Sequence, residues 1–431
     1  MSRISTLATA PPWGVILVFS APLVLPFGRT VEAPVLLMAL LGAVLLVKHW
    51  GSWRRQARVA LFCAAFLASW IPIALSLPDA VNVTKTGTIV LNHLRFLFAG
   101  LFMLHVLYED AARCLLLRLL GWLLAFWILD AVVQYFLGVD VFGFKAFPDR
   151  LSAMFGPGNS KFGLTLAVFA PALWEYARRR FGVWAAAACM VISIAVVLES
   201  GSRAAWIAAA AASGLYLSAL YLWIKILKPA ALGVSVLLLV ACGVAGYFVS
   251  DKVARGVHRA GEAISGDADE TENSLSHRVW IWKGAWSMII HNPVNGVGAR
   301  GFRYVFESYA SPDDPYLKEV PPIVPTHSHQ LLLELAAETG LLGLLGLLLM
   351  STLLVRAALK AALEERVSML PFGVAVGAAY FPFNTHLAIY SAYWSQIVWF
   401  LIALYCASVG GREASANDRA SAARSVEKYL R

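Results

Sequence analysis

Charged residues are scarce in this sequence. Asp, Glu, Lys and Arg make up 14% of the 431 residues, and hydrophobic residues make up 59%. A soluble domain has roughly 25% charged and 45–50% apolar residues, so the composition excludes a soluble globular protein. Because apolar stretches long enough to cross a bilayer as helices recur along the chain, the sequence predicts an all-α, polytopic membrane protein.

Cysteine is scarce as well. Its five positions all lie inside apolar segments and show no paired spacing: Cys63, Cys114, Cys189, Cys242 and Cys406. This pattern excludes a disulfide framework and a cysteine-based metal site, so we expect these side chains to serve in packing. The first apolar stretch lacks a small-residue cleavage site. We therefore expect a retained helix rather than a removed signal peptide, with the mature chain beginning near Met1.

Twelve apolar stretches are predicted to cross the membrane. They span residues 13–28, 31–47, 59–77, 87–107, 115–138, 162–177, 183–199, 203–223, 230–249, 329–355, 367–386 and 389–409. Very short connections within 183–223 and 367–409 leave eleven or thirteen helices as alternatives.

Loop charge predicts the orientation, because short cytoplasmic loops carry the excess of Lys and Arg. If the N-terminus is inside, every inside connection is basic. The residues concerned are Lys48, Arg54, Arg55, Arg58, Arg113, Arg118, Arg178, Arg179, Arg180, Lys225, Lys228, Arg356, Lys360 and Arg366. Both termini are therefore predicted to be cytoplasmic. The net charge of +9 is explained mostly by topology, and no nucleic-acid binding is expected.

One long external connection, periplasmic in a bacterium, divides the chain. The expected parts are transmembrane helices 1–9 at 1–249, a periplasmic loop domain at 250–328, helices 10–12 at 329–409, and a cytoplasmic tail at 410–431. The loop is predicted to hold a short helix at 253–264 and an amphipathic helix at 274–292, capped by Ser274 or Ser276. The apolar stripe of this second helix is Leu275, Val279, Trp282, Trp286 and Ile289, which would lie against the membrane or cap the bundle.

Polar residues gather where the tenth predicted helix begins. The segment contains His327, His329, Gln330, Glu334 and Glu338, and ionisable groups at such a place mark a functional site by default. The two histidines differ by two positions, so on a helix starting before Thr326 they would point in different directions and only one would face a site. The other three residues are four apart and form a polar stripe.

The predicted external face is also markedly cationic. Its basic residues are Lys85, Lys145, Arg150, Lys161, Arg203, Arg255, Arg259, Arg278, Lys283, Arg300, Arg303 and Lys318. Such a face suits a phosphate-bearing lipid, although pairing with external acids or with ordinary anionic lipids would also explain any one of them. Arg203 opens a helix without a carboxylate in its first turns, and Arg95 lies inside the fourth helix, where a charge needs a partner.

A metal site is the alternative use of these residues. His327, His329 and Glu334 offer three ligands, and Asp267-Ala268-Asp269 resembles the Asp-x-Asp pair of many sugar transferases. The Asp pair lies in a Gly/Asp/Glu/Asn run typical of a solvated linker. We therefore expect no metal and no cofactor.

Several of these motifs together resemble the O-antigen ligase and polymerase superfamily. They are Gly201-Ser-Arg203, Arg278 with Trp282, the run from Pro293 to Phe302, His327-Ser-His-Gln330 and Glu338-Thr-Gly-Leu-Leu-Gly343. The resemblance implies a bacterial inner-membrane enzyme with a periplasmic active site. It implies undecaprenyl diphosphate-linked O-antigen as donor, lipid A-core oligosaccharide as acceptor, and no nucleotide sugar or metal.

The resemblance also implies residue roles. His329 takes the place of the family histidine, although Gln330 stands where members usually have Asn. Arg203 and Arg278 would neutralise charge on the departing diphosphate, and His329 would be the general base of an inverting transfer. The further substrate-binding residues are Arg95, Arg300, Arg303, His327 and Lys161. Gln330 and Glu338 would support these groups without touching substrate.

Three other functions stay open at this point. A polymerase shares the donor and differs in the acceptor. A protein-glycosylating member tends to carry a larger C-terminal extension than the tail after Gly410. A lipid-linked glycan transporter would place its charges near the midplane and often show repeated halves, whereas here most charges lie at external helix ends and no repeat is visible. The ligase is the favoured prediction, with the oligomeric state left open.

Overall fold

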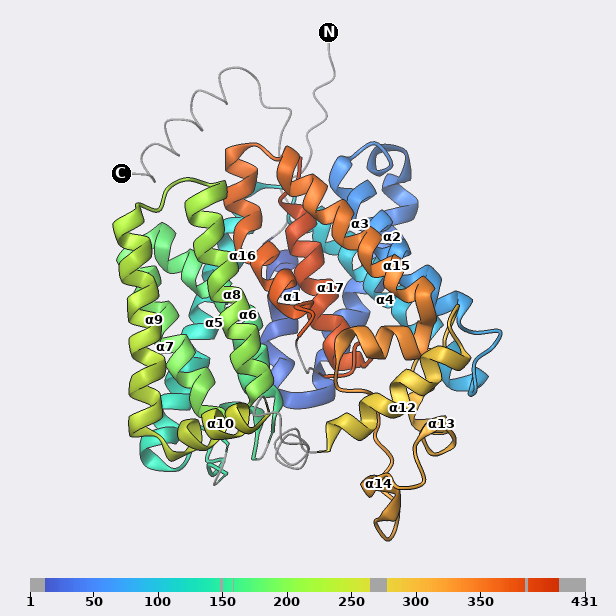
Figure 1. Ribbon diagram of the computed structural model, residues 1–431. Coiled ribbons are helices and arrows are strands. Elements are labelled where there is room, and N and C mark those ends of the chain that lie inside the picture. Colours follow the sequence, from blue (N-terminus) through green and yellow to red (C-terminus); the bar gives the residue numbers. More distant parts are fainter. Residues whose placement is uncertain (1–11, 148–149, 158, 264–276, 384–386, 411–431) are drawn as a thin grey trace.

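The structure is a computed structural model that describes residues 12–147, 150–157, 159–263, 277–383 and 387–410. Helices run side by side through a single bundle (Figure 1). The bundle helices are α1 Pro12–Val24, α2 Glu32–Trp53, α3 Ala57–Leu75, α4 Val83–Val106, α5 Asp110–Leu137, α6 Lys161–Phe181, α7 Val183–Glu199, α8 Arg203–Ser218, α9 Pro229–Val249, α15 Leu331–Lys360, α16 Leu363–Ala379 and α17 Ala392–Ala407. Each predicted stretch overlaps one of them, and the predicted all-α polytopic fold is confirmed.

Length and apolar composition qualify seven helical stretches as membrane spans, with α1 and α2 counted together as Pro12–Trp53. Two shorter apolar helices are Val183–Glu199 and Ala392–Ala407. The helix α6 is different, since it carries Glu175 and three arginines yet lies almost wholly inside the bundle, packed between α5, α7, α8 and α16. The membrane sides assigned to the loops remain a prediction.

A buried ion cluster explains how α6 tolerates its charges. The carboxylate of Glu175 has no exposed surface. It accepts hydrogen bonds from Arg178 at 2.8 Å, from Arg179 at 2.6 Å and from the hydroxyl of Tyr216 at 3.0 Å. A buried charge is tolerable only when it is paired and hydrogen-bonded, and this cluster meets that condition while tying α6 to α8.

The described short helices at the lower end of the bundle in Figure 1 are α10 Asp251–Glu262, α12 Arg278–His291, α13 Phe302–Tyr309 and α14 Pro315–Lys318. The first corresponds to the helix predicted at 253–264, and the Ser250 side chain caps it. The second corresponds to the helix predicted at 274–292, although Ser274 and Ser276, its predicted caps, lie outside the described residues.

The packed face of α12 differs from the predicted stripe. Its buried residues are Ile281, Gly284, Ala285 and Met288, whereas Trp286 of the stripe is 58% exposed. The helix has apolar side chains on two faces, and small residues decide which face packs. A Cβ on Gly284 would lie 2.8 Å from the ring of Phe306, so the glycine allows α13 to approach closely.

Candidate active site

A break in α15 organises the site. At Gly340 the backbone has φ +64° and ψ −161°, so the helix is interrupted there. The amide of Leu341 donates to the carbonyl of Pro293 at 2.8 Å, and that of Leu342 donates to Val294 at 3.1 Å. Non-helical backbone is tolerated at membrane depth when other protein groups satisfy it. The turn at residues 292–298 therefore fills the break.

The same turn is held from its other side by the α3–α4 connection. The amide of Val81 donates to the carbonyl of Val297 at 3.1 Å, and the hydroxyl of Thr86 donates to the carbonyl of Ala299 at 3.2 Å. The amide of Ala299 donates to the Ser76 hydroxyl at 3.3 Å. The loop that leads into α13 is thus clamped between two parts of the bundle.

Two carboxylates lie beneath this loop, on the first turns of α15. Glu334 and Glu338 have no exposed surface. One oxygen of Glu338 accepts the backbone N–H of Arg300 at 2.7 Å, and one oxygen of Glu334 accepts that of Ile389 at 2.9 Å. The charges of Arg300 and Arg303 lie within interaction range of both carboxylates.

The histidine segment lies just before α15. The ring centroids of His327 and His329 are 3.8 Å apart, and the condition under which the two side chains were expected to point in different directions, a helix starting before Thr326, is not met. The reason is that α15 begins only at Leu331, and His329 has φ +55°, in the left-handed region. Gln330 caps the helix by accepting the N–H of Leu333 at 2.6 Å.

Charge interactions link three side chains from separate segments at this place. Arg278, the first residue of α12, lies within charge-interaction range of Arg203 at the start of α8 and of His329. Burial, and then the positive charge of Arg278, lower the pKa of His329 to about 4. Burial and then the charge of Arg203 lower the pKa of Arg278. His329 is therefore a neutral imidazole at pH 7 within the field of the Arg278 guanidinium group.

Residues 188–348 match the family model described as O-antigen ligase. This match supports membership of the O-antigen ligase superfamily. Members of this superfamily are glycosyltransferase-like enzymes that act on lipid-linked glycans. A search of the curated proteins found no match. The matched region contains Arg203, Arg278, His329 and both buried glutamates, so the family match and the geometry single out the same part of the chain.

Two predicted site residues, Arg95 and Lys161, lie outside the region that matches the O-antigen ligase model. Arg95 forms an ion pair with Glu32 at 3.0 Å, which joins α4 to α2 and supplies the partner its charge requires. Lys161 opens α6, with its ammonium 4.4 Å from the centre of the Tyr393 ring on α17.

Sequence reasoning missed some of the residues that build the site. Glu32 is the only acid before Asp79, and that isolation was the available signal for its pairing. Trp282 was assigned only an apolar role, yet its indole N–H donates to the carbonyl of Ser328 at 3.1 Å and so holds the histidine segment against α12. No sequence signal identified the Ser76 and Thr86 clamp.

A metal site was the competing prediction for these residues. Among the residues that the structure describes, no group of three or more His, Cys, Asp or Glu side chains could hold a metal ion. Asp267 and Asp269 lie outside those residues.

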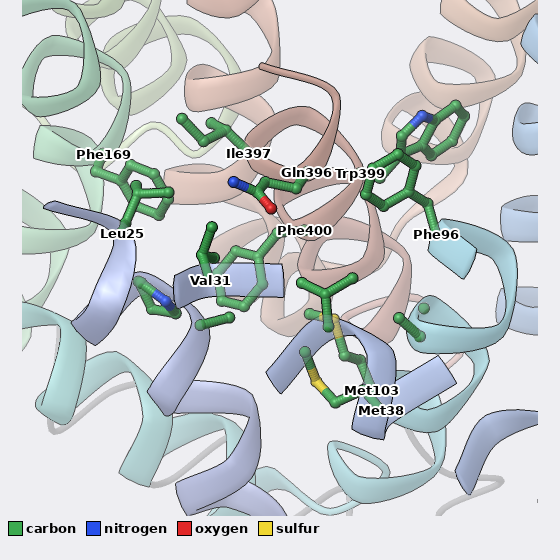
Figure 2. A pocket seen from close by; sticks show the side chains of 15 residues that line it. Leu25, Val31, Met38, Phe96, Met103, Phe169, Gln396, Ile397, Trp399 and Phe400 are labelled. Carbon is green, nitrogen blue, oxygen red and sulfur yellow. The ribbon is translucent and has the colours of Figure 1, made fainter. Parts of the chain in front are cut away.

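Two pockets within the described part of the bundle have mainly apolar walls. The one in Figure 2, about 30 Å³, lies between α1, α2, α4, α6 and α17. Gln396 is a polar group among its lining side chains, which include Phe169, Trp399 and Phe400. The other, about 320 Å³, lies between α8, α15, α16 and α17. The residues lining these two pockets do not include Arg203, Arg278 or His329.

Proposed function

We propose that this protein is an O-antigen ligase that transfers polysaccharide from undecaprenyl diphosphate to a sugar of the lipid A core. The reaction takes place at the periplasmic face of a bacterial inner membrane, and both termini are cytoplasmic. The transfer uses neither metal nor cofactor. The basic loops on the opposite side of the predicted topology support this orientation.

The observation that carries the proposal is that Arg278 interacts both with Arg203 and with His329, which come from three separate segments. Guanidinium groups pair with phosphate oxygens in a bidentate manner, and two interacting guanidinium groups, one of them near an imidazole, suit a lipid diphosphate next to a general base. A diphosphate leaves more readily when its developing negative charge is neutralised.

The proposed reaction is a direct displacement. The oxygen of an acceptor hydroxyl attacks the anomeric carbon while His329 takes the hydroxyl proton. The bond from the anomeric carbon to the diphosphate oxygen breaks, and undecaprenyl diphosphate leaves with the bonding electrons. The anomeric centre is inverted.

Donor binding should strengthen the base. Burial and then the charge of Arg278 lower the pKa of His329 to about 4, which makes a neutral but weakly basic imidazole. A bound diphosphate would offset the positive charge of Arg278 and so raise the affinity of His329 for the proton it must accept. The base would therefore become effective when the donor is in place.

A transfer assay tests the proposal. Purified protein would be given undecaprenyl diphosphate-linked glycan and rough lipopolysaccharide in the presence of EDTA, as wild type, His329→Ala and His291→Ala. His291 is a matched control, because it is exposed on α12 and its ring contacts Ser287 and Tyr309. Laddered lipopolysaccharide from the wild type and from His291→Ala, and none from His329→Ala, is the expected result.

Other outcomes of the same assay would contradict the proposal and support a different function. Lengthened glycan still attached to undecaprenyl diphosphate would identify a polymerase. No covalent product with either acceptor would favour a lipid-linked glycan transporter. Full transfer by His329→Ala would remove that residue from the reaction.

A further inference from the structure

Arg300 in the loop before α13 and Arg303 in the first turn of α13 lie within charge-interaction range of two buried carboxylates on α15, and one of these, Glu338, accepts the Arg300 N–H. We propose that Glu334 and Glu338 are positioning residues that dock this loop and neutralise its two arginines, so that the diphosphate is left to Arg203 and Arg278. This inference rests on the proposed function, and it assigns Arg300 and Arg303 a different task from direct substrate binding.

Backbone geometry carries the first step. Arg300 has φ +62°, a conformation that non-glycine residues seldom adopt without local support. Its N–H donates to Glu338 at 2.7 Å. Gly301 follows and α13 begins at Phe302, so the carboxylate holds the chain where the helix starts. Because the acceptor belongs to a membrane helix, the external loop takes its position from the bundle.

Charge balance carries the second step. Two carboxylates without exposed surface lie within interaction range of two guanidinium groups. One oxygen of each glutamate, Nη1 of Arg300 and Nε of Arg303 are buried with no hydrogen-bond partner. Two buried acceptor oxygens and two buried donor nitrogens without hydrogen-bond partners thus belong to one cluster of charged side chains. When both carboxylates are ionised, the arginines compensate buried charge that would otherwise be very costly, and this pairing would leave little positive charge for a diphosphate.

The charge balance around Arg203 and Arg278 is different. Among the described residues, the charged groups that act on Arg203 are Arg259 and Glu262, and Arg203 in turn acts on Arg278. Within that part of the chain the arginines of this group outnumber the acid, which suits a polyanionic ligand. The docked loop reaches the same segment through Arg303, whose Nη2 donates to the carbonyl of Thr326 at 3.4 Å. Glu338 therefore acts on the site through the loop.

A double-mutant cycle tests this division. Arg303→Gln alone leaves two buried carboxylates with one arginine, so transfer should fall by about tenfold, which corresponds to ~1.4 kcal/mol. Thermal stability in detergent should fall as well. Adding Glu338→Gln restores the balance and keeps a carbonyl oxygen for the Arg300 N–H. The double variant should therefore recover most of both losses, since residues in one network are coupled.

Arg278→Gln, with and without Glu338→Gln, is the matched control. It should raise the KM for the lipid diphosphate donor, and the second substitution should not rescue it. If Arg303→Gln instead raises the donor KM and Glu338→Gln gives no recovery, Arg303 binds the donor directly and the inference is overturned. If wild type transfers no glycan, or Arg278→Gln keeps full activity, the proposed function fails. The coupling between Arg303 and Glu338 in thermal stability would still report on docking.

Discussion

Replacing Gly340 by alanine should undo the docking of the loop at the break in α15. The combination of φ +64° and ψ −161° lies in a region open essentially to glycine alone, and a Cβ there would overlap the carbonyl of Val294. Backbone strain of this kind is worth about 1–3 kcal/mol. If the loop moves away, the hydrogen bonds from Leu341 and Leu342 to the loop are lost at about 0.5–1.5 kcal/mol each. Together these terms amount to about 2–6 kcal/mol.

Thermal unfolding in detergent, followed by intrinsic fluorescence of the 15 tryptophans, measures this effect. The apparent Tm of Gly340→Ala should fall by roughly 5 °C or more, and transfer activity should fall with it because Glu338 and Arg300 lose their alignment. Gly214→Ala is the matched control. Gly214 lies within α8 with no atom near the position of an added Cβ, and alanine in a helix interior is favoured over glycine by about 1 kcal/mol.

An unchanged Tm for Gly340→Ala would refute the reasoning, since it would mean that the helix is not broken at this residue or that the loop does not fill the break. A fall of equal size in Gly214→Ala would show that the assay reports general sensitivity of the bundle.

The remaining predictions concern proton transfer, bundle stability and metal. Because the pKa of His329 is lowered to about 4, the reactive neutral form persists below the usual value of about 6.5. The kcat/KM profile for the donor should therefore lose activity only as pH falls towards 4. In Arg278→Gln the acid limb of this profile should move to higher pH, because a positive charge that lowers the pKa of His329 is gone. An unmoved limb would show that Arg278 does not influence the pKa of His329. Glu175→Ala leaves Arg178 and Arg179 without their buried partner and should destabilise the bundle by about 3–5 kcal/mol, as a lower Tm in detergent. Any folded fraction should keep the donor KM of the wild type, and a raised KM would place Glu175 in the site. Prolonged EDTA treatment should leave transfer unchanged, and activity restored only by added metal would contradict the metal-independent mechanism.

Local sequence patterns were sufficient to predict the helices and the residue types of the site. Apolar runs identified every bundle helix, because a membrane span needs a continuous apolar surface of a set length. The same reasoning drew attention to Arg203, Arg278 and His329, since charges and imidazoles at the ends of such runs are rare. The apolar stripe on α12 was less informative about packing. Two faces of this helix are apolar, and periodicity cannot say which one packs against α13.

Tertiary structure alone decided which of these groups meet. Arg95 needed a partner, and only the packing of α2 against α4 identified Glu32. The approach of His327 to His329 depends on the left-handed backbone of His329 and on the start of α15 at Leu331, two residues after the predicted start at 329. Contacts between distant segments depend on how the helices pack and on where a backbone can break. The break in α15 requires both Gly340 and the loop that fills it, so the sequence of either segment alone does not predict the break.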